Sequence, residues 1–312
     1  MSWQKRVINF TLRLGEASLL TLRKDAIVYS ASVSEKRPEL ARRAPREEMR
    51  DAGVGIALIA SCMVDEDLPL LSLVADCVRY VPWQYEHYFV DVEGTFDDYL
   101  RKFTRKTRHE LRREIRRFAD LSNGAILWRE YRHPEEVDEF YEHGRQVSRK
   151  TYQERLFDGG LPEGEESRRN LKRLAAEGSL LAYVLFHGDK PVAYLNGYVA
   201  RETVLVAENM GYDPEYSEWS PGTILQLLMI EKWCKERTIR AMDYGTGEGS
   251  HKKFFSNRSC RCAHVYFCER RLRHMSPALA HMAMAQISRG LVRGLALLRL
   301  KDRVKKLIRK RA

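Results

Sequence analysis

Three apolar runs follow one another between residues 180 and 210, and they constrain the fold more than any other part of the sequence. The first two, Leu180–Phe186 and Pro191–Val199, are separated by the four turn residues His-Gly-Asp-Lys. Apolar runs of this length that are bounded by turn residues are typical of buried strands, and the short turn predicts an antiparallel hairpin. We expect Thr203–Met210 to add a third strand, antiparallel to the second.

Helical and strand-like segments flank this hairpin on both sides. Their order predicts an α+β fold, in which a mixed and mostly antiparallel sheet is flanked by helices and followed by a helical C-terminal tail. The expected helices are Pro134–Leu156, Glu165–Glu177, Pro221–Lys235 and the short Lys252–Phe255. The expected strands are Ala125–Tyr131, Ile239–Tyr244 and Cys260–Cys268.

The N-terminal third of the chain also reads as strands. Apolar and polar residues alternate from Ile8 to Leu14, which predicts a half-buried strand. Residues 34–51 are charged and contain two prolines, so we expect a loop with helical fragments. Gly53–Val64 and Leu68–Ala75 suit two buried strands, or one strand and one helix. Arg79–Val92 suits an aromatic strand that is interrupted at Pro82.

A basic helix is expected from Thr95 to Phe118. Thr95 can cap it, and apolar residues recur at steps of three or four along one face. The other faces carry nine Lys and Arg between Arg101 and Arg117, against two acids, Glu110 and Glu114. This charge either contacts an anionic polymer such as tRNA or is a solvated helix face.

The net charge of +11 is concentrated at one end of the 312-residue chain. From Arg271 onward there are twelve Lys and Arg and one acid, whereas residues 1–270 hold equal numbers of bases and acids. This distribution argues against a basic surface spread over the whole protein. No apolar run is long enough to span a membrane and no signal peptide is visible, so we expect a cytoplasmic protein.

The C-terminal tail, Ser276–Arg311, is expected to be an amphipathic helix whose apolar face is surrounded by Lys and Arg. It would lie on the inner, anionic surface of a membrane, or dock on the protein itself; nucleic acid is a weaker third partner. The apolar face consists of Leu297, Leu300, Val304, Leu307 and Ile308.

An anion site is predicted where the Pro221–Lys235 helix begins. Ser220 is a candidate cap, Pro221 has no N–H to lose, and Gly222 lets a ligand approach the backbone. Free amides of Gly222, Thr223 and Ile224 at the positive end of the helix would suit a diphosphate. The alternative is that Ser-Pro-Gly simply caps the helix.

Five short stretches in residues 104–268 together resemble the GNAT acetyltransferase superfamily, in particular the CelD/BcsL type, which is related to the Fem peptidyltransferases. The resemblance implies two acetyltransferase-like domains in tandem: a degenerate one (1–95), a second one with its leading basic helix (96–270), and the tail (271–312). It also implies acetyl-CoA or another acyl-CoA along Trp219–Thr223, although Gly222 alone stands where simpler acetyltransferases carry several glycines. The stretches are Thr104–Arg108 with Leu111–Arg113, Lys150–Gln153, Gly188–Ala193, Gly211–Pro214 with Ser220–Gly222, and Asp243–Gly245 with His251–Phe254.

Acyl transfer needs a group that removes a proton from the acceptor and amides that polarise the carbonyl. Tyr152, Asp243 and Glu208 are our candidates for proton transfer. For Tyr152 the alternative is ring packing, and for Asp243 it is a turn cap. The backbone of Leu205–Asn209 would polarise the carbonyl. Other candidate acids and bases are Glu154, Glu248 and His251, and Lys252 and Lys253 would bind phosphate or an anionic acceptor unless they are merely solvated.

No arrangement of residues suggests a covalent nucleophile or a metal. Cys260, Cys262, His264 and Cys268 fall on one side of a strand and lack the spacing of a zinc knuckle, so we expect half-buried thiols. Direct transfer in a ternary complex is therefore favoured.

Three functions remain open. The first is an acyl-CoA-dependent acyltransferase acting on an amine or hydroxyl of a sugar-type or small-molecule acceptor, for instance in extracellular polysaccharide biosynthesis. The second is a Fem-like transfer of an aminoacyl group from charged tRNA, with the basic helix as its footprint. The third is a non-enzymatic adaptor for a membrane surface or nucleic acid.

Overall fold

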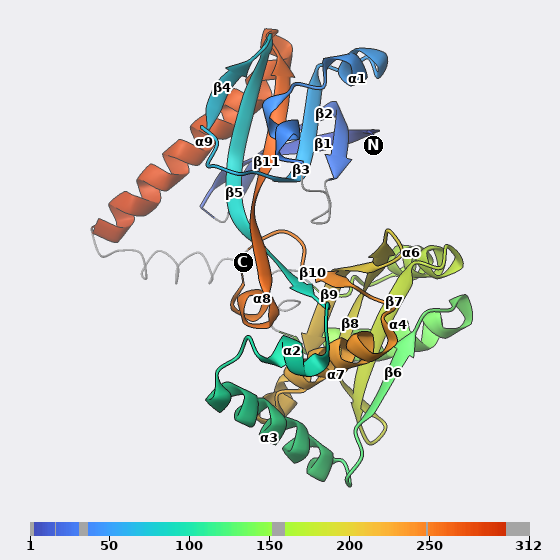
Figure 1. The fold of residues 1–312 in the computed structure, drawn as a ribbon. Coiled ribbons are helices and arrows are strands. Elements are labelled where there is room, and N and C mark those ends of the chain that lie inside the picture. Colours follow the sequence, from blue (N-terminus) through green and yellow to red (C-terminus); the bar gives the residue numbers. More distant parts are fainter. Residues whose placement is uncertain (1–2, 16, 31–36, 152–159, 248, 298–312) are drawn as a thin grey trace. The chain divides into compact units, whose positions relative to one another are not determined.

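The computed structural model describes residues 3–15, 17–30, 37–151, 160–247 and 249–297, with side chains up to residue 291 (Figure 1). The chain divides into two compact units, Met1–Glu86 with Cys260–Ala312, and His87–Ser259. This division differs from the expected domain boundaries after residues 95 and 270. The reason is that the strand after residue 258 returns to pair with a strand near residue 60, which no local sequence signal announces.

The first unit is built on a mixed sheet with the strand order β1-β2-β3-β11-β5, and β4 pairs with β5. The pairs β1–β2, β3–β11 and β4–β5 are antiparallel, and β2–β3 is parallel. Its strands are β1 (Gln4–Leu14), β2 (Ala17–Ser30), β3 (Ile56–Met63), β4 (Leu71–Val74), the first part of β5 (Cys77–Asp91) and most of β11 (Arg258–Glu269). Its helices are η1 (Pro38–Arg42), α1 (Arg46–Asp51) and α9 (Leu272–Leu297).

The alternation predicted for residues 8–14 is confirmed in its first half alone, because Leu12 is only partly buried and Leu14 is exposed. Ile8 and Phe10 are buried, and they pack with Ala278 and Met282 of α9. The first half of the C-terminal helix therefore docks on its own unit. This agrees with the second alternative for the tail, docking on the protein itself, for this part of the helix. The predicted apolar face from Leu297 onward lies outside the described side chains. Among the described helices, none is long and apolar enough to cross a bilayer.

The expected interruption of β5 at Pro82 is wrong, because the strand runs unbroken from Cys77 to Asp91. Proline cannot donate a ladder hydrogen bond, so it is tolerated where none is needed.

The second unit is a sheet with the strand order β5-β10-β9-β8-β7-β6, in which only the β9–β10 pair, among the described strands, is parallel. The predicted hairpin and third strand are confirmed. The strands are β6 (Leu127–Tyr131), β7 (Leu180–His187), β8 (Lys190–Ala200), β9 (Val204–Tyr212) and β10 (Ala241–Asp243). The helices are α2 (Phe96–Leu100), α3 (Arg105–Leu121), η2 (Pro134–Glu136), α4 (Val137–Ser148), α6 (Glu165–Ala176), η3 (Pro214–Trp219), α7 (Pro221–Glu236) and α8 (Ser250–Phe255).

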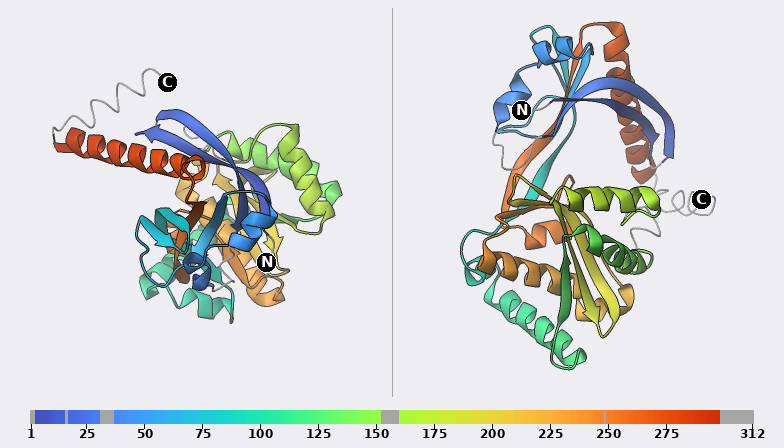
Figure 2. Two further views of the ribbon diagram at one scale, coloured as in Figure 1. Left: turned by 90° about the horizontal axis from the view of Figure 1, so that it is seen from above. Right: turned by 90° about the vertical axis from the view of Figure 1, so that its right-hand side faces the viewer.

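Helices cover both faces of this sheet (Figure 2). Alternate residues of β7 point to opposite sides, because side chains alternate along a strand. Leu181 and Leu185 pack in the core under α2, α3 and α7, whereas Ala182 and Val184 pack in the core under α4 and α6. The two buried faces explain why β7 reads as a continuous apolar run.

The single basic helix expected from Thr95 to Phe118 is instead two helices, α2 and α3. Thr95 does cap α2, where its side chain and that of Asp98 form a capping box. A second cap, Thr104, accepts a hydrogen bond from the amide of Thr107 (3.2 Å) and starts α3. Because apolar spacing continues through both helices, only this second threonine marked the break.

Candidate active site

A cavity lies beside the end of β9, beyond the point where β9 and β10 part. The two strands pair in parallel only from Val204–Ala241 to Val206–Asp243, after which β10 ends and β9 continues to Tyr212. Beyond Val206, the edge of β9 that faced β10 has no strand partner among the described residues. A cavity of about 470 Å³ lies beside the end of β9, and the start of α7 and part of α8 line it as well.

The start of α7 differs from the expected anion site. Ser220 has a left-handed backbone (φ 51°) and its side chain makes no cap hydrogen bond. Its carbonyl instead accepts the amides of Thr223 (2.9 Å) and Ile224 (3.1 Å). Two of the three amides that we expected to be free are therefore engaged, and of the three only the Gly222 amide has no hydrogen-bond partner among the described residues.

Three of the residues predicted to bind the cofactor lie at the wall of the cavity. Ser220, Gly222 and Thr223 line the cavity. Trp219 and Ile224 pack against the core under α7 instead, and Ile224 is fully buried. A Cβ at Gly222 would lie 3.4 Å from the ring of Tyr212, so glycine keeps this wall of the cavity open.

Asp243 is a buried carboxylate with two partners. Its Oδ1 accepts a hydrogen bond from Nε2 of His87 (2.6 Å) and another from the amide of Gly245 (2.7 Å). The second bond is the turn cap that we weighed as the alternative role. The His87 partner was missed, because it lies 156 residues away in sequence, inside an aromatic run that reads only as a strand.

Glu208 occupies a β-bulge in β9. The register passes from Asn196–Asn209 to Gly197–Ala207, which leaves Glu208 as the extra residue. Glu208 is exposed, yet desolvation by the neighbouring protein atoms raises its pKa, and the charge of Arg173 offsets part of this. A carboxyl group with a raised pKa is suited to accept a proton near neutral pH.

The bulge depends on Gly197. A Cβ at this position would lie 2.0 Å from the backbone oxygen of Val206, so no larger residue fits without moving the backbone. The sequence contains this glycine in the middle of a strand, which is a known signal for a bulge.

Tyr198 and Asn196 complete a polar group of residues that the sequence did not reveal. Tyr198 pairs with Val206, and Val206 pairs with Asp243, so Tyr198 and Asp243 lie on the same face of the sheet. Burial raises the pKa of Tyr198, and the carboxylates of Glu208 and Asp243 add to the effect. Asn196 is 1% exposed, and both polar atoms of its amide lack a hydrogen-bond partner among the described residues.

The two lysines of α8 do not point to one anion site. Lys252 donates to the carbonyl of Thr246 (2.8 Å), and burial lowers its pKa. Lys253 is exposed, while His251 lines the cavity with its pKa lowered by burial. Tyr152, Glu154 and Glu248 lie outside the described residues; Thr151, next to Tyr152, lines the cavity.

The described cysteines are free thiols, and Cys260 and Cys262 lie with their sulfur atoms 3.7 Å apart. Within the part of the chain that the structure describes, no group of three His, Cys, Asp or Glu side chains could hold a metal ion.

A comparison with protein families finds a match that covers most of the residues that line this cavity. The family model described as "Acetyltransferase (GNAT) domain" matches residues 105–253. The matched residues, 105–253, make up slightly less than half of the 312-residue chain, and we refer to them by this likeness as the GNAT domain. This match covers α3, the β7–β8 hairpin, β9 with its bulge, α7 and both lysines of α8. No curated protein matches the chain.

Solved structures share the fold over most of the chain. FemX is 12% identical, with 85% of this chain and 88% of that chain covered and a TM-score of 0.51. A conserved protein of unknown function from Bacteroides thetaiotaomicron is 11% identical, with 86% of each chain covered and a TM-score of 0.50. L-PGS from Bacillus licheniformis is 17% identical, with 84% and 85% covered and a TM-score of 0.49. At these identities the likeness to FemX and to the Bacteroides thetaiotaomicron protein concerns the fold alone.

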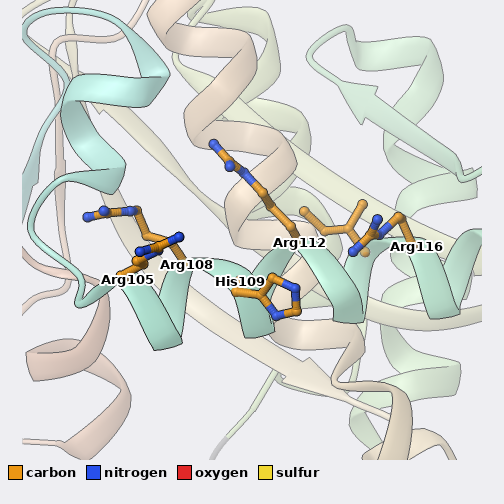
Figure 3. Close-up of a pocket in the computed structure, with 6 residues that line it drawn as sticks. Arg105, Arg108, His109, Arg112 and Arg116 are labelled. Carbon is orange, nitrogen blue, oxygen red and sulfur yellow. The ribbon is translucent and has the colours of Figure 1, made fainter.

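The GNAT domain also carries a basic surface on α3 (Figure 3). A surface hollow of about 690 Å³ is lined by Arg105, Arg108, His109, Arg112 and Arg116, together with Ile115. Arg112 lies 3.4 Å from Asp97, and Arg108 donates to the carbonyl of Phe103 (2.7 Å). Arg105 and Arg116 have no acidic partner among the described residues, so their charge is available to an anion.

Proposed function

We propose that the GNAT domain transfers an acetyl or other acyl group from acyl-CoA directly to an amine or hydroxyl acceptor. The observation that carries this proposal is the cavity at the end of β9, with Gly222 at its wall. The unpartnered edge of β9 after Val206 offers backbone amides to a thioester carbonyl. The diphosphate would bind at the Gly222 amide, with the hydroxyls of Ser220 and Thr223 beside it.

We assign proton removal to Glu208. Its carboxylate takes the proton of the acceptor while the acceptor nitrogen or oxygen attacks the carbonyl carbon. The bond between that carbon and sulfur then breaks, and the thiolate is protonated by Tyr152 or by water. Asp243 acts indirectly, since its carboxylate holds His87 and the turn at Gly245 in place. Asn196 and Tyr198 would orient the acceptor from the face that α4 and α6 cover.

The acceptor that we favour is of the sugar type, and the synthesis of an extracellular polysaccharide is a suitable context. The polar face formed by Asn196, Tyr198 and Glu208 supports it, because amide, phenol and carboxylate groups match the hydroxyl and amino groups of a sugar. We propose a cytoplasmic protein that works close to the inner membrane surface.

A second candidate donor is charged tRNA, which the arginine-lined surface of α3 favours. Arg105 and Arg116, which lack acidic partners, would contact backbone phosphates, and such contacts would make binding strongly dependent on salt. This donor would use the same carboxylate and the same acceptor face, so only the donor distinguishes the two hypotheses.

Calorimetric titration with acetyl-CoA and, separately, with charged tRNA discriminates between the donors. We expect acetyl-CoA to bind. With an amino-sugar acceptor present, Glu208→Gln should lower the rate at which CoA thiol is released by about 10²-fold or more. Glu202→Gln is the matched control, because Glu202 is an exposed carboxylate just before the same strand. Absence of acetyl-CoA binding at millimolar ligand would exclude the first donor. Binding of tRNA that weakens in Arg105→Ala/Arg116→Ala would favour the second.

A further inference from the structure

The first unit carries an apolar surface that its own core leaves uncovered. Six of the large hydrophobic side chains that are exposed in the described structure lie on β1, β2 and the later part of α9. Along the hairpin of β1 and β2, the apolar face is covered at its base and bare at its tip. The six residues are Val7 (59% exposed), Leu14 (37%), Leu19 (57%), Leu20 (54%), Ile287 (53%) and Leu291 (50%).

The register explains why the tip is bare. Phe10 pairs with Leu22, and both pack in the core with α9. Leu12 pairs with Leu20 on the same face of the ribbon, but Leu20 is more than half exposed. Leu19 is the extra residue of a bulge between the Leu12 and Arg13 pairs, so its side chain is also turned out of the core.

The hairpin tip and the later part of α9 meet each other. The amide of Gly15 donates to Oγ of Ser288 (2.9 Å), and α9 runs alongside β1 (Figure 2). The leucines of the tip and the apolar pair Ile287 and Leu291 therefore belong to one part of the surface. We call Leu14, Leu19, Leu20, Ile287 and Leu291 the hairpin–helix patch.

Positive charge accompanies the patch. Arg13 and Arg289 are exposed and lie next to patch residues in the chain, residues 272–291 of α9 contain no acid, and the sequence between Leu14 and Leu19 contributes one acid, Glu16. The sequence that follows, from residue 292 to residue 312, holds nine Lys and Arg and one acid. A second copy of the chain would bring like charges together on this surface, whereas an anionic bilayer would attract them.

We propose that the hairpin–helix patch is a membrane-docking surface that inserts its leucines into the interface of an anionic phospholipid bilayer. Exposed apolar side chains with a cationic border match such an interface, where acyl chains lie beneath phosphate groups. This surface is distinct from the predicted amphipathic tail, because it requires the β1–β2 tip. It does not depend on the proposed acyl transfer.

The test is flotation of the full-length protein with vesicles. We expect binding to vesicles of phosphatidylcholine with about one-third phosphatidylglycerol, little binding to phosphatidylcholine alone, and release as salt rises. Leu19→Ser/Leu20→Ser should weaken binding by about tenfold or more, because two apolar side chains no longer enter the interface. The matched control is Leu73→Ser/Leu127→Ser, since these leucines are 65% and 51% exposed elsewhere on the surface.

The control double variant should bind as the wild type does, and circular dichroism should show both variants folded. Wild-type protein that stays free of anionic vesicles would overturn the proposal. So would Leu19→Ser/Leu20→Ser protein that binds as tightly as the control. Light scattering gives a further outcome. If the wild type is a dimer and Leu19→Ser/Leu20→Ser is a monomer, the patch binds a second copy of the chain, and the membrane proposal is overturned.

Discussion

Gly197→Ala tests whether the bulge that presents Glu208 is required. The new Cβ would lie 2.0 Å from the backbone oxygen of Val206, whereas carbon and oxygen atoms in contact are more than 3 Å apart. The obstacle is backbone, so it cannot move aside as the end of a flexible side chain would. Overpacking of this kind lowers the free energy of unfolding by about 1–3 kcal/mol. We expect about 3 kcal/mol here, because strands β8 and β9 must separate locally.

Chemical denaturation and thermal melting measure this cost. A loss of about 3 kcal/mol lowers the melting temperature by roughly 6–12 °C in a unit of this size. Acyl transfer should fall as well, since the carboxylate of Glu208 moves with the bulge. Gly290→Ala is the matched control: its Cβ would meet nothing within 4 Å, and alanine in a helix is favoured over glycine.

If Gly197→Ala protein melted like the wild type, the bulge would be a tolerant irregularity and our assignment of Glu208 would lose its structural basis. If stability fell while transfer per folded molecule stayed unchanged, the bulge would be needed for folding and not for catalysis.

Three further predictions follow from the same unit. Gly222→Val should weaken acetyl-CoA binding by about 1–3 kcal/mol in calorimetry, because a branched side chain would cover the one free amide of α7; unchanged affinity would place the diphosphate elsewhere. Tyr152→Phe should lower turnover by roughly 10²-fold with little change in melting temperature, and a wild-type rate would reduce Tyr152 to packing. Burial lowers the pKa of Lys102 to about 7 from 10.5, so the unfolded chain binds one more proton between these values and stability should rise with pH across this window. Lys102→Met should remove that rise in melts between pH 7 and 9, and an identical pH dependence in both proteins would contradict it.

Local patterns predicted most elements of the second unit. The strands of the hairpin and the Pro221–Lys235 helix match β7, β8 and α7 within a residue or two, because their signals are apolar runs, turns and a proline at the first helical position. The two-helix form of residues 95–121 was missed, although Thr104 was available as a second cap. The apolar spacing continues across the break, so periodicity alone favoured one helix.

The sequence indicated some of the residues of the candidate site but not the hydrogen bonds that they make. Glu208 and Asp243 stood out as carboxylates near the ends of strands, and Gly222 as a glycine at a helix start. The bonding that defines their roles was not visible. Two of the amides expected to bind phosphate donate hydrogen bonds to the carbonyl of Ser220 instead. The carboxylate of Asp243 is hydrogen-bonded to His87.

By itself, the sequence determined the α+β class, the hairpin at the centre of the GNAT domain and the concentration of charge in α3 and the C-terminal segment, because each depends on residues close together in the chain. Tertiary structure alone decided the return of β11 to β3, the His87–Asp243 bond and the bare tip of the β1–β2 hairpin. These three features depend on residues that are far apart in the chain. A strand pattern shows which side chains are apolar, but it does not show which of them are covered by another element of the fold.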